Sequence, residues 1–521
     1  MFRLHRASFS SELPRSATSP EPSTENVPLH IPSFSRQNTS STPQPLNSPH
    51  ESEEEDREVS FFLRHFSEAA GRWMDLFDLD CYYSRQVPVL ARSNPLVKYA
   101  ACALAAKQLG RVNGRKAVFG GLSHRLASME TWPRSDTSAS DYMWYGMKYY
   151  DKSISLLMQA ISDEDGNTGG ARRDDYNRRY DDETIVAATI LCIYEFLSAT
   201  TTGWSRHLDG TQSLLRLTNQ ELLFQFQPSP RPAAAAPTPP KALRAAFWNF
   251  ARQDFLASII SCKHTRLNIN DLEMWRAMGL SLDEMGLVSM LDADPPLRDD
   301  MVANTLVWLL CKIGNFIASD EEQEQAEGDC AAAAGGLGSR SLHDTWRMLD
   351  VELTRWHDSL PDTFQPSTQV RVARLSPSLD TETWYSNSMC ASTMQSYHMA
   401  RMLMLLHRPP ELLLLLDASN DTASSGSHPR APRRHRQDLL STYKTMQTQL
   451  FGHAVHICSI ALGRPDDSTR IHMLQPLYYS GRCMSDRRDQ KVVRELIEDI
   501  ERDTGWATGY RVEQLVQEWA V

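Results

Sequence analysis

The sequence has no two cysteines close enough together to form a local zinc site. Its nine cysteines are scattered over 521 residues, and the closest pair, Cys311 and Cys330, is 19 residues apart. Zinc knuckles and clusters need ligand pairs that are separated by only a few residues. Most of the cysteines stand in apolar helical segments, as Cys192 does. This pattern indicates reduced, buried thiols.

Signatures of the common enzyme classes are also missing. There is no Gly-x-Ser-x-Gly elbow and no His-Glu-x-x-His helix. The segment Gly336-Leu337-Gly338 follows an alanine tract rather than a strand and lacks the Lys-Ser/Thr of a nucleotide loop, so it is interpreted as a flexible loop. We therefore expect a protein that is not an enzyme, with no catalytic residue and no cofactor.

Four pairs of adjacent aspartates are candidates for the magnesium-binding pattern of all-α terpene enzymes. None continues as Asp-Asp-x-x-Asp, and all stand where loops end or helices begin. Helix capping accounts for them better, because a carboxylate there accepts from free backbone N–H groups. The pairs are Asp174-Asp175, Asp181-Asp182, Asp299-Asp300 and Asp466-Asp467.

The histidines give no metal site either. His453 and His456 are three residues apart on an expected helix, which would direct both imidazoles to one side, but no third ligand is evident. His398 and His407 are nine apart and do not share a helix face cleanly. We interpret all four as structural histidines and expect no bound metal.

No hydrophobic run is long enough to predict a membrane span. The most apolar window, Ile185–Leu197, is too short to span a bilayer and contains Glu195, so it is interpreted as a buried helix. The first ten residues lack the apolar stretch of a secretory signal. We expect no membrane partner.

The charge balance is acidic, with a formal net charge of −11 and a pI of about 5.8. Such a chain is not drawn to nucleic acid by its mean field, so DNA contact would need a local basic patch. The one concentrated basic run lies in a Ser/Pro-rich stretch and contains Arg430, Arg433, Arg434 and Arg436. It is a candidate nuclear-import signal or phosphate-contact patch, and the alternative is a solvated loop.

Helical periodicity dominates what is present, and it predicts an all-α fold. Residues 1–57 are rich in Ser, Thr, Pro and acidic side chains and are expected to be a disordered tail, whereas residues 58–521 are expected to form one large helical domain. Low-complexity stretches that are expected to be loops interrupt this domain. They are Asp163–Asp181, Gln227–Pro240, Asp320–Gly338 and Asp417–Gln437.

Two helices are specified well by their side chains. Leu342, Trp346, Leu349, Leu353, Trp356 and Leu360 form one apolar stripe on a helix expected over Ser341–Leu360. A helix over Ser386–Arg408 is apolar on several sides and ends at Pro409-Pro410. Any ligand pocket is expected among the aromatic and Met-rich residues Phe247–Phe255 and Met389–Met404, although core packing explains them better.

A series of motifs follows in a fixed order over nearly all of residues 60–519. They include the segment FLRHFSEAAGRWMDLFDLDCYY from Phe62, ILCIYEFL from Ile190, GWSRHLDGTQSLLRL from Gly203, AAFWNFARQDFLAS from Ala245, NTLVWLLCKIGNFI from Asn304, LPDTFQP from Leu360, STMQSYHMARMLMLLHRP from Ser392 and ALGRPDDSTRIHMLQPLYYSGRC from Ala461. In this order the motifs resemble the regulatory domain of fungal binuclear zinc-cluster transcription factors.

The resemblance implies a nuclear transcription regulator that acts through a helical regulatory domain. The partners implied are transcriptional co-regulators or a partner transcription factor, with a small-molecule effector as a further alternative. In the family, an N-terminal cluster of six cysteines reads DNA, but no cysteine precedes residue 61 here, so none of the family's functional residues is transferred. Either a cluster lies upstream of this sequence, or the protein reaches DNA only indirectly.

Two functions from other classes remain as alternatives. One is a helical interaction scaffold without a transcriptional role, since a shared fold does not dictate function. The other is an all-α enzyme whose site has no recognisable motif.

Overall fold

The computed structural model describes ten ranges of the chain: residues 49–112, 138–165, 182–198, 208–213, 239–288, 297–329, 337–372, 376, 378–409 and 435–520. Regular structure in these ranges is helical apart from two short strands and one isolated bridge, which confirms the all-α fold class.

The α-helices are distributed along the whole described chain. Their bounds are α1 Pro49–Glu68, α2 Ala70–Met74, α3 Val87–Leu90, α4 Pro95–Arg111, α6 Ala139–Asp165, α7 Asp182–Phe196, α9 Lys241–Ser261, α10 Leu272–Ala277, α11 Asp299–Asp329, α12 Leu337–Asp358, α13 Ser388–Leu406, α15 His435–Leu462, α16 Asp467–Arg470, α17 Leu474–Arg482, α18 Arg487–Thr504 and α19 Gly509–Trp519. The remaining elements are the π-helix η1 (Tyr82–Gln86), the 3-10 helices η2 (Asp362–Phe364) and η4 (Ile471–Met473), and the strands β1 (Thr368–Arg371) and β2 (Thr381–Trp384).

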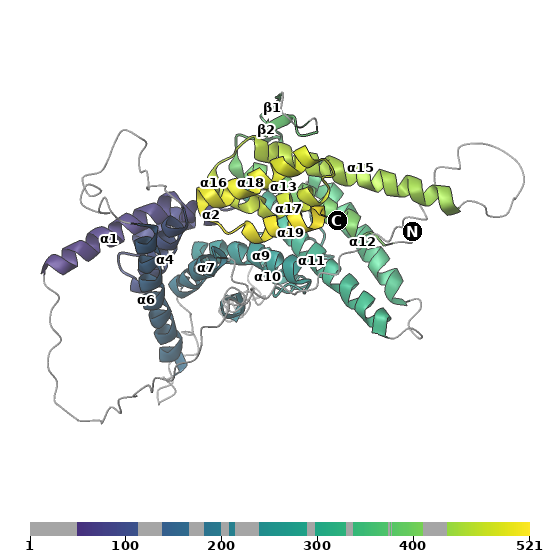
Figure 1. Cartoon of the computed structure of the whole chain (residues 1–521). Coiled ribbons are helices and arrows are strands. Elements are labelled where there is room, and N and C mark those ends of the chain that lie inside the picture. The colour runs from purple at the N-terminus through teal and green to yellow at the C-terminus, as the bar shows by residue number, and fades with distance from the viewer. Residues whose placement is uncertain are drawn as a thin grey trace, which may run out of the picture.

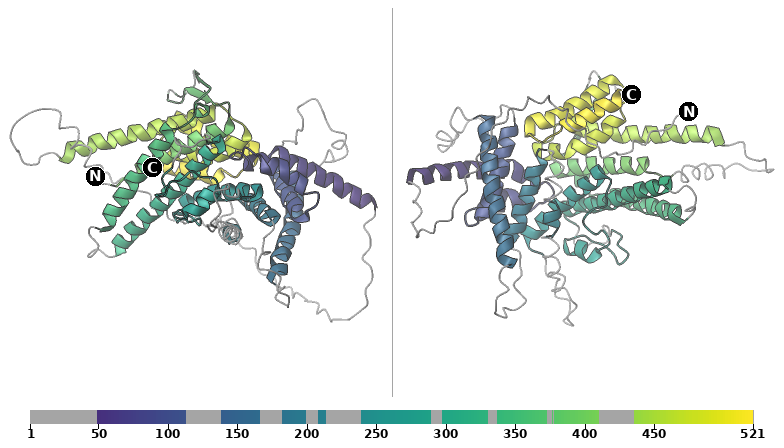
Figure 2. Two further views of the ribbon diagram at one scale, coloured as in Figure 1. Left: turned by 180° about the vertical axis from the view of Figure 1, so that it is seen from behind. Right: turned by 60° about the horizontal axis from the view of Figure 1, so that its bottom comes forward.

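The long helices pack in a continuous series. α6 lies along α4, α4 contacts α7, α7 contacts α9, and α9 contacts α11. From α11 the series continues through α13 and α15 to α17 (Figure 1). The views in Figure 2 show α1, α4 and α6 at one end of the molecule and the projecting part of α15 at the other.

The C-terminal helices contact the N-terminal helices. Gln108 Nε2 and Arg111 Nε, on α4, donate to the carbonyl oxygens of Thr504 and Gly505 at the C-terminal end of α18, at 3.0 and 2.6 Å. The indole of Trp506 stacks on Phe196 and packs edge-on against Trp73. The first and last described elements therefore belong to one packed unit.

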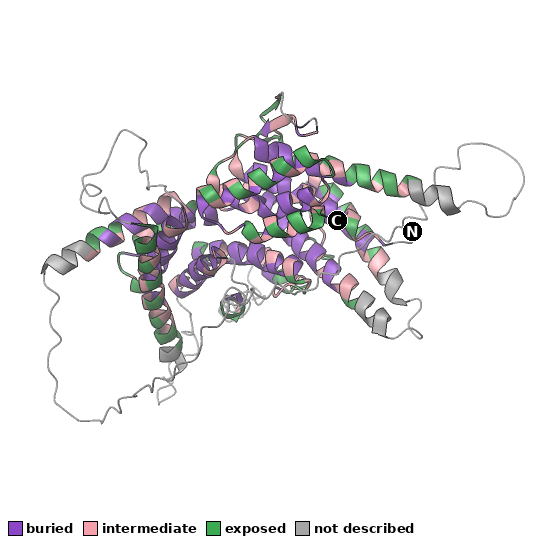
Figure 3. Cartoon of the chain, viewed as in Figure 1, coloured by how far each residue is buried: buried purple, intermediate pink, exposed green. Residues whose placement is uncertain are grey.

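The core is continuous and runs through the middle of the series (Figure 3). Every residue from Thr184 to Tyr194 of α7 is buried, which confirms the interpretation of this apolar window as a core helix. The alanines of α4 are buried as well, and Gly146 of α6 comes so close to Lys107 that an added Cβ would lie about 3.2 Å from backbone. Small side chains permit this close approach of α4 and α6.

The positions of α12 and α13 agree closely with those predicted from the spacing of their apolar residues. The stripe residues Trp346, Leu349, Leu353 and Trp356 are buried, and α13 begins after its N-cap Asn387 and ends before Pro409. The predicted start of α12 at Ser341 was wrong, because the helix begins at Leu337. The prediction of a flexible loop over Gly336–Gly338 was therefore wrong for Leu337 and Gly338, which belong to the first turn of α12.

Further helix boundaries differ from expectation, and one hairpin was not predicted. α11 continues through the acidic segment to Asp329, because Glu, Gln and Ala favour helix even where they cannot form a core. α1 begins at Pro49, so the boundary expected at residue 58 falls inside it, where Glu55 and Glu58 pair with Lys152 and Lys148 of α6. The antiparallel hairpin β1–β2 was not predicted, since four-residue strands give little periodic signal.

One described helical segment, Asp299–Glu322 of α11, is long and apolar enough by length and composition to cross a membrane. Of its apolar window, 83% is buried within the protein against neighbouring helices. Core helices of globular proteins meet the same criterion, so the segment is weak evidence for a span.

Replacement of Trp356 tests the packing of α11 on α12. Its indole is 1% exposed and donates from Nε1 to the carbonyl oxygen of Val302 at 3.1 Å. We expect Trp356→Ala to lower the free energy of unfolding by about 3–5 kcal/mol, because it leaves a cavity and an unpaired carbonyl. The control is Trp384→Ala, where the indole is 49% exposed. Equal destabilisation of both variants in chemical denaturation would contradict this packing.

Candidate functional site

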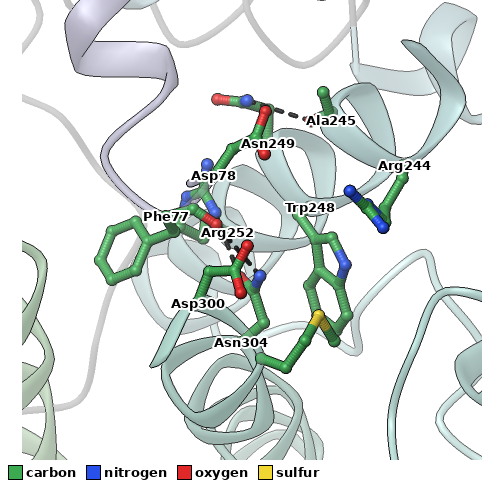
Figure 4. A pocket seen from close by; sticks show the side chains of 10 residues that line it. Phe77, Asp78, Arg244, Ala245, Trp248, Asn249, Arg252, Asp300 and Asn304 are labelled. Carbon is green, nitrogen blue, oxygen red and sulfur yellow. Dashed lines mark hydrogen bonds between the residues drawn. The ribbon is translucent and has the colours of Figure 1, made fainter. Parts of the chain in front are cut away.

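A narrow pocket lies where α9, the start of α11 and the loop after α2 meet (Figure 4). It includes residues from the predicted segment Phe247–Phe255, which supplies Trp248, Asn249 and Arg252. The full lining is Phe77, Asp78, Arg244, Ala245, Trp248, Asn249, Arg252, Asp300, Met301 and Asn304. The volume is about 10 Å³, which is room for one water molecule.

Arg252 is the most unusual group in this pocket, because its side chain is a buried cation without an ion-pair partner among the described residues. The residue is only 7% exposed, and its guanidinium lies over the ring of Phe77 at 4.7 Å. Its hydrogen bonds to Asn304 Oδ1 and to the carbonyl of Met74 are long, 3.5 and 3.4 Å. Nε has no partner. Burial lowers the pKa of Arg252 to about 10.

Two asparagines bind backbone carbonyls at the end of α2. Asn249 Nδ2 donates to Met74 O at 2.9 Å, and Asn304 Nδ2 donates to Phe77 O at 3.2 Å. Carbonyls at a helix C-terminus have no partner within the helix, so a buried end needs donors from elsewhere. α9 and α11 supply these donors and thereby fix the loop after α2.

Ion pairs surround the mouth of the pocket. Arg244 pairs with Asp80, and Arg298 pairs with Asp300 at 2.8 Å and with Asp80 at 3.5 Å. Asp300 also accepts from the backbone N–H of Leu79 at 3.3 Å. Because the arginines are partly exposed, each pair contributes little to stability, but together they join the loop to α9 and α11.

The C-terminal part of the chain reaches the same place through His472 of η4. Its ring packs edge-on against Phe77 with centroids 5.6 Å apart. Burial, together with the nearby charge of Arg252, lowers the pKa of His472 to about 3. The Phe77 ring thus contacts groups from the middle and from the C-terminal part of the chain, and we call this set of residues the Phe77 junction (Phe77, Asn249, Arg252, Asn304 and His472).

The junction could bind one hydrogen-bond acceptor. The unpaired Nε of Arg252 is a charged donor in a place where one water or one acceptor group of a ligand would fit. A pocket for a whole small molecule measures hundreds of Å³, so the arrangement as it stands does not enclose one.

None of the other predicted site residues that the structure describes lines this pocket. Arg430, Arg433 and Arg434 fall outside the described residues, and Arg436 lies in the first turn of α15, where only the backbone is described. The methionines of α13 between Met389 and Met404 are buried in the core and do not line the pocket.

The pair His453 and His456 lies beside a third histidine, His398, which the sequence did not place there. His398 of α13 lies beside His453 of α15, with their Nδ1 atoms 3.0 Å apart, and stacks on His456 with centroids 4.7 Å apart. His407 does not belong to this group, in agreement with its spacing from His398, and its Nδ1 lies 3.3 Å from Asp320 Oδ2. In the part of the chain that the structure describes, no three His, Cys, Asp or Glu side chains are arranged to hold a metal ion.

The described aspartate pairs stand at helix starts, as expected. Asp466 is the N-cap of α16 and accepts from the backbone N–H of Thr469 at 3.1 Å. Asp299 and Asp300 lie in the first turn of α11, and Asp182 lies in the first turn of α7. Asp174, Asp175 and Asp181 lie outside the described residues.

Comparison with known proteins gives a family match over nearly the whole helical region. The model of the fungal specific transcription factor domain matches residues 61–519. A transcription activator from Alternaria alternata, AMTR1, is 34% identical over 512 residues, which is 89% of this chain and 64% of the relative. The chain therefore spans less than two thirds of that relative's length. No solved structure matches.

Substitutions at the junction compare how much a donor to a buried carbonyl and a buried charge each contribute to stability. We expect Asn304→Ala to lower the free energy of unfolding by about 1–3 kcal/mol, because the buried carbonyl of Phe77 loses its donor. Arg252→Met is expected to change it by less than about 1 kcal/mol, because a similar volume replaces a charge that burial disfavours. Urea denaturation of both variants checks this, and a larger loss for Arg252→Met would contradict it.

The buried histidines predict a pH dependence of stability. Burial lowers the pKa of His65 and His453 to about 4 and that of His472 to about 3. Protonation near pH 6.5 then occurs only in the unfolded chain, so their contribution is present above pH 6.5 and is lost as the pH falls toward 4. Asp75 acts in the opposite direction, since burial raises its pKa to about 6.

Replacement of one histidine isolates this effect from that of Asp75. We expect the melting temperature of His472→Gln to fall less between pH 7 and pH 5 than that of the unsubstituted chain, whatever its value at pH 7. Thermal melts of both proteins across this range measure the difference. Parallel pH profiles would show that His472 is not neutral in the folded state.

Proposed function

Because the chain belongs to the family of fungal specific transcription factor domains, we propose that it regulates transcription. The observation that carries this proposal is the family match over residues 61–519, which covers nearly all of the helical unit. The relative from Alternaria alternata is a transcription activator, and it is similar over 89% of this chain. We therefore propose activation rather than repression.

The proposed route to DNA is indirect. The chain has a net charge of −11, and its cysteines are too far apart for a six-cysteine cluster. Sequence-specific recognition requires an element that enters a groove and reads base edges. In our proposal a partner transcription factor supplies that element, or a zinc cluster outside these 521 residues does. Both alternatives stay open, and both make the helical domain a surface for co-regulators.

A small-molecule effector is the second kind of partner in this proposal. Support comes from the Phe77 junction, where buried Arg252 presents an unpaired donor at a narrow cavity. An acceptor group of an effector would replace the water that fits there, while the rest of the molecule would lie outside. Because the junction joins α2, α9, α11 and η4, such a contact would reach three parts of the chain.

Tethering to a promoter tests transcription activation directly. We expect the full chain, fused to an unrelated DNA-binding domain, to raise expression of a reporter several-fold over that DNA-binding domain alone. The fused domain replaces the missing route to DNA, so only the regulatory activity is measured. Unchanged expression in a host that supplies the co-regulators of a related fungus would contradict the proposed activation.

Nuclear import by the basic run is a separate prediction. We expect replacement of Arg430, Arg433, Arg434 and Arg436 by alanine to move a fluorescent fusion out of the nucleus, because import signals are read as clustered basic charge. The matched control removes four exposed basic residues from α18, namely Arg487, Arg488, Lys491 and Arg494. Equal distributions of the two variants would assign the basic run to a solvated loop.

A further inference from the structure

Three histidines from two helices meet where α13 packs on α15 (Figure 1). The Nδ1 atoms of His398 and His453 are 3.0 Å apart, and the ring of His398 stacks on that of His456, with an angle of 7° between the ring planes. His398 and His453 are half-buried, and His456 is exposed. Water can therefore reach this group of imidazoles.

The packing of α13 on α15 fixes the relative position of the rings. One turn before His398, the buried side chain of Gln395 donates from Nε2 to the carbonyl oxygen of Ile457 at 3.1 Å. Ala454 and Ile457, which follow His453 and His456 on α15, are completely buried. The two helices thus hold the imidazole nitrogens at a set distance, which is what a preorganised metal site requires.

The distance between the two Nδ1 atoms matches that of two ligands on one metal ion. Imidazole nitrogens bind zinc at about 2.0–2.1 Å, so two of them 3.0 Å apart correspond to an N–metal–N angle of roughly 94°. Neighbouring ligands in tetragonal coordination are about 90° apart, and a tetrahedral pair would need a separation larger by about 0.3 Å. A metal ion therefore fits between the rings with little movement.

The chemistry of the two rings indicates which metals fit. Burial lowers the pKa of His453 to about 4 and that of His398 well below its ordinary value, so both rings are neutral at pH 7 and available as ligands. Arg401, one turn after His398, forms an ion pair with Asp350 at 2.9 Å, which offsets its positive charge. Imidazole suits Zn²⁺, Ni²⁺ and Cu²⁺, whereas Ca²⁺ and Mg²⁺ prefer oxygen ligands.

The orientation of His456 sets it apart from the pair. Its ring is parallel to that of His398, and the lone pairs of ring nitrogens lie in the ring plane, so they do not point to the space between the two Nδ1 atoms. This agrees with the finding that the described residues contain no group of three side chains arranged to hold a metal ion. Two protein ligands with water in the other positions remain.

We propose that His398 and His453 bind one divalent transition-metal ion, which joins α13 to α15, with water in the remaining coordination positions. Both rings then carry their hydrogen on Nε2, and two metal–nitrogen bonds replace the hydrogen bond between the rings. The sequence predicted no metal at His453 and His456 because no further ligand was evident, and the fold supplies His398 from 55 residues away. The ion stabilises the folded chain, because only the folded chain holds the two rings together.

Zinc titration of the purified full chain tests the site. Calorimetry with ZnCl₂ compares the unsubstituted chain with His398→Gln, His453→Gln and the matched control His456→Gln. We expect the first two variants to bind one Zn²⁺ fewer, or to bind it at least about tenfold more weakly, because even the loss of a group that only supports a ligand costs about 10–100-fold in affinity. The control should keep the site.

Thermal melts separate metal binding from effects on folding. Zn²⁺ should raise the melting temperature of the unsubstituted chain and of His456→Gln above its value in EDTA. This rise should be absent in His398→Gln and His453→Gln, whatever their melting temperatures in EDTA. Mg²⁺ should give no rise, and an equal rise with Mg²⁺ would contradict coordination by imidazole.

Three other outcomes would overturn the proposal. Equal zinc binding by all four proteins would mean an adventitious ion only. An unsubstituted chain whose melting temperature does not respond to Zn²⁺ would leave His398 and His453 as a hydrogen-bonded pair without a metal. A loss of binding in His456→Gln as large as in the other variants would contradict the assignment of two ligands. None of these readouts depends on transcription, so the regulatory function is tested independently.

Discussion

The structure depends on the need of buried backbone carbonyls for donors at the end of α2. A five-residue helix cannot satisfy its own C-terminal carbonyls, and here that end lies inside the protein. Asn249 of α9 donates to Met74 O at this end, Asn304 of α11 donates to Phe77 O in the loop that follows, and the ring of His472 of η4 packs against the Phe77 ring. One polar requirement thereby joins segments that are hundreds of residues apart in sequence, which explains how a long series of helices forms a single unit.

Sequence alone predicted the parts of this fold that depend on local periodicity. The apolar stripe of α12, the all-round burial of α7 and the Pro-terminated α13 follow from side-chain spacing and capping residues. The extension of α11 to Asp329 was not predicted, because a low-complexity segment is typical of a loop, although its Glu, Gln and Ala residues favour helix. The β1–β2 hairpin was missed because its strands are too short to show alternation.

The candidate site was predicted only in part, and for a physical reason. The aromatic segment of α9 pointed to the right helix, but Phe77 and Asn304 carry no local signal of their roles, since each acts through a tertiary contact. The pairing of His398 with His453 was invisible for the same reason. Patterns within one helix are legible in the sequence, whereas contacts between helices require the fold.

Regulation of transcription is the central claim, and chromatin occupancy combined with transcript levels tests it most directly. Chromatin immunoprecipitation of the tagged chain should enrich a set of promoters over an untagged control, and transcripts from those promoters should fall when the chain is removed. Absence of enrichment, together with unchanged transcripts after removal, would contradict the account and favour a helical scaffold without a transcriptional role.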